Sequence, residues 1–310
     1  MVALPLKFLV NRPSSAKGWS LRWPVCLGSV AVDLSKIAGL GLALVLWLGW
    51  PKPTTAASMA PAAVHPVGGL AVLSHSAHRA TVWGDHCLSL VQLERYDEAI
   101  ADCSRAIQLD GHRPEHRLNR GIALYRTGRF AEALVDDTEV LVQHPHDFRG
   151  YYNRGLVQVA LHRFEAAITD FDRAAGLTLD PLSLTDIYDD RGLAKLMAAQ
   201  PQQALHDFDQ ALAIDGQNIR ALFNHGCACH QMGRLNDALT DFNQVLALDP
   251  GHARTYLKRG LLRRSLGDRE GGVADLQQAE NCAQAHGEQH LHHYILTLLN
   301  EWQRPDMAVG

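Results

Sequence analysis

The sequence predicts an all-α solenoid, in which helical hairpins stack and each hairpin contacts only its neighbours. An Arg-Gly or His-Gly dipeptide recurs with its glycine at positions 121, 155, 192, 226 and 260, which are 34, 37, 34 and 34 residues apart. Within the units, apolar residues follow the i, i+4, i+7 spacing of amphipathic helices. A period of this length indicates a repeat architecture, because one hairpin cannot bury its apolar faces alone and stacked copies can.

The unit at 221–250 shows how one hairpin is expected to form. Leu222, Gly226 and Cys229 share one face of a first helix, and the same spacing recurs on a second helix from Ala238 to Leu246. A glycine-containing turn separates the two helices. An Asp-Pro dipeptide ends the second, because proline disfavours helix at the residue before it.

This pattern resembles the tetratricopeptide repeat (TPR) family. The resemblance covers two thirds of the chain and implies a right-handed α-α superhelix. The first copy has Cys87 where glycine recurs, and the sixth has two glycines, at 271 and 272, which weaken its second helix. With residues 182–184 placed as an insertion, six copies fit, at 80–113, 114–147, 148–181, 185–218, 219–252 and 253–286.

The segments on either side of the repeats differ from them in composition. Residues 1–36 are basic and residues 37–50 are apolar. Residues 51–79 form a linker that we expect to be flexible, with no charged side chain from 53 to 78. After the repeats, residues 287–304 carry apolar side chains at helical spacing, which predicts a capping helix followed by a tail over 305–310.

The apolar run at 37–50 predicts a membrane anchor or the hydrophobic region of a signal peptide. As a helix it rises about 21 Å, which is short of a hydrocarbon core of about 30 Å. Small residues after the run suit cleavage, whereas the long basic segment before it favours an uncleaved transmembrane helix. Five Lys and Arg residues precede the run and one follows within the next 28 residues. This bias predicts a cytoplasmic N-terminus, with the repeats on the far side, which is periplasmic, luminal or extracellular.

The TPR resemblance also implies that the first helices line a concave, peptide-binding groove. An asparagine amide offers both a donor and an acceptor to a peptide backbone, although the recurring Asn-Arg-Gly is equally explained as part of the repeat itself. Acidic residues in mid-array and basic ones at the C-terminal end predict a ligand with an acidic segment or a C-terminal carboxylate. The alternative is a solvated face that keeps the array soluble. The predicted groove residues are Asn119, Tyr125, Tyr152, Asn153, Asp189, Asp190, Asn224, His230, Arg254, Lys258 and Arg264.

Histidines near the C-terminus suggest a metal site. His286, His290 and His293 would share one arc of a single helix, where imidazoles bind divalent ions. The alternative is a set of surface histidines, with His286 left outside the helix if it starts at Gly287.

The cysteines pose a separate question. Cys87 and Cys103 fall on the two helices of the first repeat, which allows either a disulfide in an oxidising compartment or two buried core residues. The Cys-Ala-Cys-His run at 227–230 resembles a metal-binding fragment, but its two sulfurs, at i and i+2, point to different faces of a helix. We interpret this run as a coincidence.

The sequence contains no nucleotide-binding or hydrolase motif, so we expect neither an enzyme nor a cofactor. The net charge of −4 provides no basic field for nucleic acid. The predicted function is a TPR scaffold that is membrane-tethered or exported and aids the assembly or stability of a protein complex. The alternatives are a metal-handling protein that uses the C-terminal histidines, or an auxiliary subunit of an enzyme.

Overall fold

The computed structural model describes residues 67–303, and within this range it contains thirteen helices and no strand. The helices are α2 (Val67–Gln92), α3 (Tyr96–Leu109), α4 (Pro114–Arg126), α5 (Phe130–Gln143), α6 (Phe148–Ala160), α7 (Phe164–Ala175), α8 (Pro181–Met197), α9 (Pro201–Ile214), α10 (Ile219–Gln231), α11 (Leu235–Leu248), α12 (Ala253–Ser265), α13 (Arg269–Ala285) and α14 (Gln289–Gln303).

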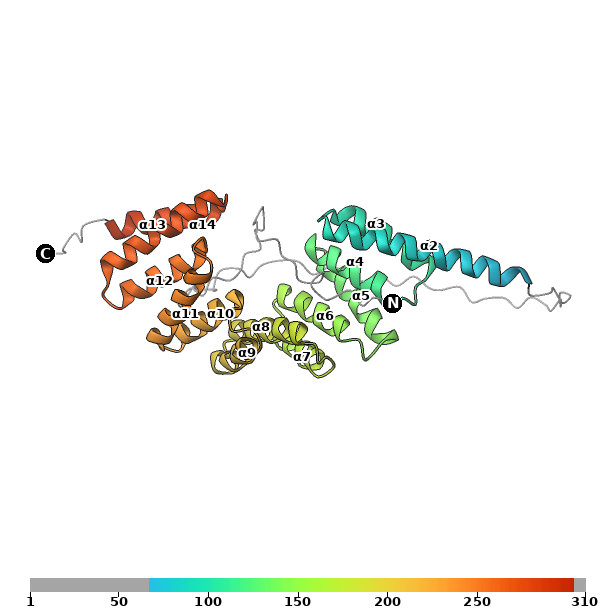
Figure 1. Ribbon diagram of the computed structural model, residues 1–310, viewed down its shortest axis with the longest axis horizontal. Helices are drawn as coiled ribbons and strands as arrows, with labels where there is room; N and C mark the ends of the chain where they lie inside the picture. The colour runs from blue at the N-terminus through green and yellow to red at the C-terminus, as the bar shows by residue number, and fades with distance from the viewer. Residues whose placement is uncertain (1–66, 304–310) are drawn as a thin grey trace, which may run out of the picture.

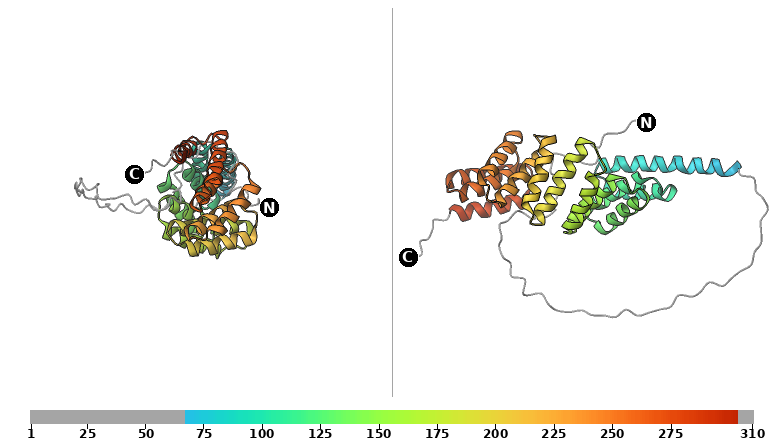
Figure 2. Two further views of the ribbon diagram at one scale, coloured as in Figure 1. Left: turned by 90° about the vertical axis from the view of Figure 1, so that its left-hand side faces the viewer. Right: turned by 90° about the horizontal axis from the view of Figure 1, so that it is seen from below.

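The helices form antiparallel pairs that follow one another along an arc, with α8 and α9 near its middle (Figure 1). Each helix packs mainly against the next one in the chain, and the even-numbered first helices of successive pairs also contact each other from α2 to α12. Seen from below, the stack is elongated, whereas the other view looks along it from one end (Figure 2). The described residues are therefore an all-helical solenoid, as the repeat pattern predicts.

A tight turn with a left-handed residue joins the two helices of each pair. Glycine occupies this position in three turns, at Gly128, Gly233 and Gly267, with φ between 75° and 92°. The following residue closes the turn, since the Arg129 N–H donates to the Leu124 carbonyl over 2.8 Å. This bond satisfies a carbonyl at the helix end, so the chain reverses immediately and the second helix packs on the first.

A glycine on each inner repeat's first helix lets the second helix approach closely. In three repeats this glycine lies against a fully buried phenylalanine 16 residues later, in the pairs Gly155–Phe171, Gly192–Phe208 and Gly226–Phe242. A Cβ atom at these glycines would lie only 2.6–2.8 Å from the ring. We call this pair of positions the glycine–aromatic slot, and it explains why the dipeptide recurs.

An ion pair lies directly beside each slot, because its two members precede the slot residues in the chain. In four repeats an arginine donates two hydrogen bonds of 2.6–2.9 Å to an aspartate carboxylate. Histidine replaces the arginine in the first and fifth repeats. The pairs, each 16 residues apart, are His86–Asp102, Arg120–Asp136, Arg154–Asp170, Arg191–Asp207, His225–Asp241 and Arg259–Asp275.

The first repeat closes its slot covalently. Cys87 and Cys103 form a disulfide with Cα atoms 5.3 Å apart, and they occupy the positions that glycine and phenylalanine hold in later repeats. Of the two arrangements that the sequence allows for these cysteines, a disulfide or two separate core residues, the structure has the disulfide. A covalent link stabilises this outer hairpin by restricting the unfolded chain.

Both ends of the array differ in detail from the sequence expectations. Helix α2 begins at Val67, so the last part of the segment expected to be a flexible linker is helical. The glycines of the sixth repeat do not interrupt α13, where Gly272 lies close to the backbone of Gly260, so its missing side chain permits close packing. Helix α14, at the predicted position of the capping helix, buries Ile295 and Leu299 against this repeat.

The predicted membrane segment at 37–50 lies outside the described residues, as do the rest of 1–66 and the tail from 304. Among the helices from α2 to α14, none combines the length and the apolar character that a bilayer crossing requires.

Substituting a slot glycine tests the packing directly. We expect Gly192→Ala to lower the free energy of unfolding by about 1–3 kcal/mol, because the new Cβ atom would lie 2.6 Å from the Phe208 ring. Gly176→Ala is the matched control, since its nearest neighbours are 3.6 Å away. Urea denaturation followed by circular dichroism measures both variants, and equal stabilities would contradict the close contact.

Candidate functional site

A pocket opens among the first helices of the central repeats, on the inner side of the array. The first helices of four hairpins contribute to it, together with one residue from α5, which is a second helix. It is lined by Gly121, Ile122, Tyr125 and Arg126 of α4, Asp137 of α5, Tyr152, Asn153, Leu156 and Val157 of α6, Asp190 of α8 and Arg220 of α10.

One wall of the pocket is a hydrogen-bonded network that connects three repeats. The Tyr152 hydroxyl donates to Asp190 over 2.7 Å, and Arg220 donates to the other oxygen of Asp190 over 2.7 Å. Arg220 also pairs with Asp189 at 2.5 Å, and the Asn224 amide donates to Asp189 over 2.8 Å. Burial raises the pKa of Asp189, and the Arg220 charge opposes that rise. The network therefore fixes α6, α8 and α10 relative to one another.

The pocket also contains a carboxylate whose hydrogen-bonding capacity is unused. Asp137 is 0% exposed, and neither of its oxygens has a hydrogen-bond partner. It occupies the slot position that phenylalanine fills in three other repeats, opposite Gly121. Burial, and then the neighbouring charge of Asp136, raise the pKa of Asp137 well above its usual range. The Asn153 Nδ2 donor is also buried without a partner.

Two family models described as "Tetratricopeptide repeat" match the chain, one at residues 85–137 and one at residues 219–252. The chain is a tetratricopeptide-repeat protein. No curated protein sequence matches this TPR chain significantly.

Solved structures share the fold of the TPR array at low sequence identity. PilF of Pseudomonas aeruginosa is 15% identical with a TM-score of 0.61, and the match covers 72% of this chain and 99% of PilF. A chain of the APC/C hetero-tetramer Cut9–Hcn1 is 16% identical with a TM-score of 0.59, over 74% of this chain and 46% of that one. MamA of Desulfovibrio magneticus is 18% identical with a TM-score of 0.50, and the match covers 56% of this chain and 97% of the MamA chain. These likenesses concern the fold alone.

The structure brings some of the predicted groove residues of the TPR array together and leaves others apart. Tyr125, Tyr152, Asn153 and Asp190 line the pocket. Asp189 and Asn224 belong to the hydrogen-bonded network but do not line the pocket, and neither do Asn119 and His230.

Sequence reasoning missed Asp137 and Arg220. The signal for Asp137 is the Asp-Asp pair at 136–137, where other repeats have Asp-Phe. Arg220 lies in the first turn of α10, away from the recurring Asn-Arg-Gly positions from which the groove was predicted.

The predicted charge polarity of the groove also differs from the structure. Asp189 and Asp190 are buried and paired with Arg220, so they are not a solvent-facing acidic patch. At the C-terminal end, Arg254 lies 3.9 Å from Glu288 and Lys258 is only 7% exposed. The Arg264 guanidinium lies 4.3 Å from the centre of the Trp302 ring, and none of these three cations lines the pocket.

The C-terminal histidines do not share one helix. His286 is the residue that ends α13, and Gly287 then takes a positive φ of 71°. His290 and His293 are exposed on α14. The expectation of one helical arc of three imidazoles is therefore wrong for His286, because the chain turns between the two helices.

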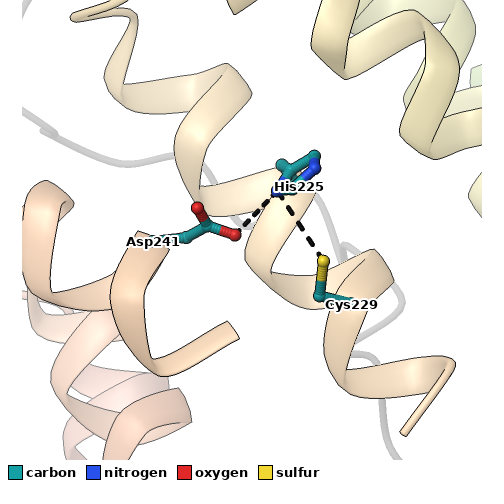
Figure 3. Close-up of side chains that lie close together, drawn as sticks. All are labelled: His225, Cys229 and Asp241. Atoms are coloured by element: carbon teal, nitrogen blue, oxygen red, sulfur yellow. Dashed lines mark hydrogen bonds and ion pairs between the residues drawn. The ribbon is translucent and has the colours of Figure 1, made fainter. Parts of the chain in front are cut away.

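A different set of metal-ligating groups meets in the fifth repeat. His225 Nδ1 lies 2.7 Å from an Asp241 oxygen and 3.7 Å from Cys229 Sγ (Figure 3). All three donor atoms lie within 4.8 Å of one another. Cys227 is not part of this group.

The same positions hold two cations around one aspartate in the fourth and sixth repeats, as in Arg191 and Lys195 around Asp207. The His–Cys pair thus replaces two cations. The arrangement differs from a catalytic relay, in which one ring nitrogen of the histidine contacts the nucleophile and the other contacts the carboxylate. Here the Cys229 thiol and the Asp241 carboxylate both approach the same nitrogen, Nδ1. Burial also raises the pKa of Cys229 to about 11.

The buried carboxylate predicts a pH dependence of stability. The pKa of Asp137 is raised in the folded state, so folding favours its protonated form and Asp137 destabilises the fold increasingly as pH rises above about 4. We expect Asp137→Asn to gain stability relative to wild type as pH increases from 4 to 8. Thermal unfolding across this range measures the difference, and a difference that does not change with pH would contradict the assignment.

Proposed function

We propose that the TPR array is a non-enzymatic scaffold that binds a protein partner through its concave pocket. The observation that carries the proposal is the pocket itself, which places apolar side chains beside buried polar groups that lack partners. Binding sites have this composition, because apolar contacts supply affinity and a few polar groups fix orientation. A peptide segment supplies both kinds of contact.

The pocket is well ordered by its own wall. Tyr152, Asp190 and Arg220 come from three different repeats and are held by bonds of 2.7 Å. A site that is already ordered loses less conformational entropy on binding. This supports a role as a docking platform for a partner, and we extend it to the assembly or stability of a protein complex.

We further propose that the repeats lie in an oxidising compartment, exported or tethered by the N-terminal segment. The Cys87–Cys103 disulfide supports this location, because cytosolic thiols are normally kept reduced. Sequencing of the mature N-terminus separates a cleaved signal from an anchor.

Partner capture with pocket variants tests the scaffold function. Ile122 lines the pocket, and we expect Ile122→Lys to lose a defined set of captured proteins because it replaces an apolar contact by a charge. Leu179→Lys is the matched control, since Leu179 is 93% exposed and lies outside the pocket. Quantitative mass spectrometry of cross-linked complexes measures the loss. Equal capture by both variants, with folding verified by circular dichroism, would contradict the proposal.

A second candidate function is metal binding, which the His225, Cys229 and Asp241 cluster favours. Imidazole, thiolate and carboxylate are all zinc ligands, and the three donor atoms lie within 4.8 Å of one another. Purified without a histidine tag, the protein is expected to bind about one zinc per chain by elemental analysis.

His225→Arg, which installs the residue of four other repeats, is expected to lose this zinc and keep its fold. His290→Arg is the control, because it changes an exposed histidine on α14, and this variant is expected to keep the zinc. Zinc lost through His290 instead of His225 would assign binding to the C-terminal histidines.

A further inference from the structure

We propose that the pocket recognises a basic side chain, lysine or arginine, of the bound peptide, and that the carboxylate of Asp137 is its counter-charge. This rests on the proposed function of the pocket and names the chemistry of its ligand. It differs from the acidic ligand that the sequence predicts.

Asp137 occupies the slot position of the second repeat, against Gly121. In the third, fourth and fifth repeats a fully buried phenylalanine ring packs on the slot glycine. In the second repeat the glycine is retained as Gly121, but the ring is replaced by a shorter carboxylate. Gly121 and Asp137 both line the pocket, so the pocket borders the slot from which the ring is missing. The pocket therefore borders a modified core position, which has a carboxyl group in place of a ring.

The cations near Asp137 donate no hydrogen bond to it, although the charge of Arg154 acts on its carboxyl group. Its neighbour Asp136 is held by two hydrogen bonds from Arg120, and the nearby Asp170 is held by Arg154. Arg126 also lines the pocket but donates no hydrogen bond to Asp137.

On the opposite wall, Asp190 already accepts from Tyr152 and Arg220. A buried carboxylate without a partner is costly, and a cation from a ligand offsets that cost.

The remaining lining fits the other parts of a basic residue. Ile122, Leu156 and Val157 offer apolar surface to the methylene stem of lysine or arginine, whose charged group lies at the far end. The Asn153 Nδ2 donor has no partner, and a main-chain carbonyl of the peptide is a suitable acceptor. One residue of an extended peptide thus supplies the cation, the stem and the acceptor together.

Four blocked pentapeptides test the proposal on the full chain by NMR titration. Each has alanine on both sides of a central lysine, arginine, glutamine or glutamate. We expect the lysine or arginine peptide to shift the Asn153 side-chain amide signal and to bind about 10-fold or more tightly than the glutamine and glutamate peptides. The tighter of the two basic peptides identifies the preferred cation.

Variants of Asp137 separate recognition from folding. We expect Asp137→Asn to weaken binding of the basic peptide about 10-fold or more. Asp137→Phe, which restores the ring of the other repeats, is expected to abolish binding while keeping or raising the unfolding temperature. The matched control, Asp97→Asn, changes an exposed acid on α3 and is expected to bind like wild type.

Equal affinities for the basic, glutamine and glutamate peptides would overturn the proposal, and so would absence of binding by both basic peptides. Unchanged binding by Asp137→Asn would do the same. Each of these results leaves the scaffold function standing if partner capture still depends on Ile122, whereas loss of that dependence removes the scaffold function itself.

Discussion

The contact between the two helices of each hairpin is the constraint on which the rest of the molecule depends. A glycine on the first helix removes the Cβ atom that would otherwise collide with the second, and a residue 16 positions later fills the space. An arginine–aspartate or histidine–aspartate pair beside the slot fixes the register. Because every repeat reuses this register, the hairpins have similar shapes and stack into one continuous array.

Departures from the common slot account for the unusual chemistry of individual repeats. Cysteines in the first repeat make the contact covalent at Cys87–Cys103. An aspartate in the second repeat, Asp137, leaves room for a pocket. Replacement of two cations by His225 and Cys229 in the fifth repeat assembles three metal-ligating groups. In each case one or two side chains change the function of a position while the backbone geometry is retained.

The helical array could be predicted from the sequence, because the glycine spacing and the apolar periodicity are local signals that repeat. The pocket could be predicted only in part. Tyr152, Asn153 and Asp190 follow from their places on first helices, but the pairing of Asp190 with Arg220 depends on two repeats meeting in space. Asp137 was missed because it lies on a second helix, where the expected groove had no residues.

We propose that a partner occupies the inner face of the central repeats. Hydrogen–deuterium exchange of the protein with and without its captured partner measures this most directly. We expect slower exchange on binding in α4 and α6, around Gly121 and Asn153, with little change in α7 and α9. Protection confined to the outer helices, or to the last repeat and α14, would contradict it.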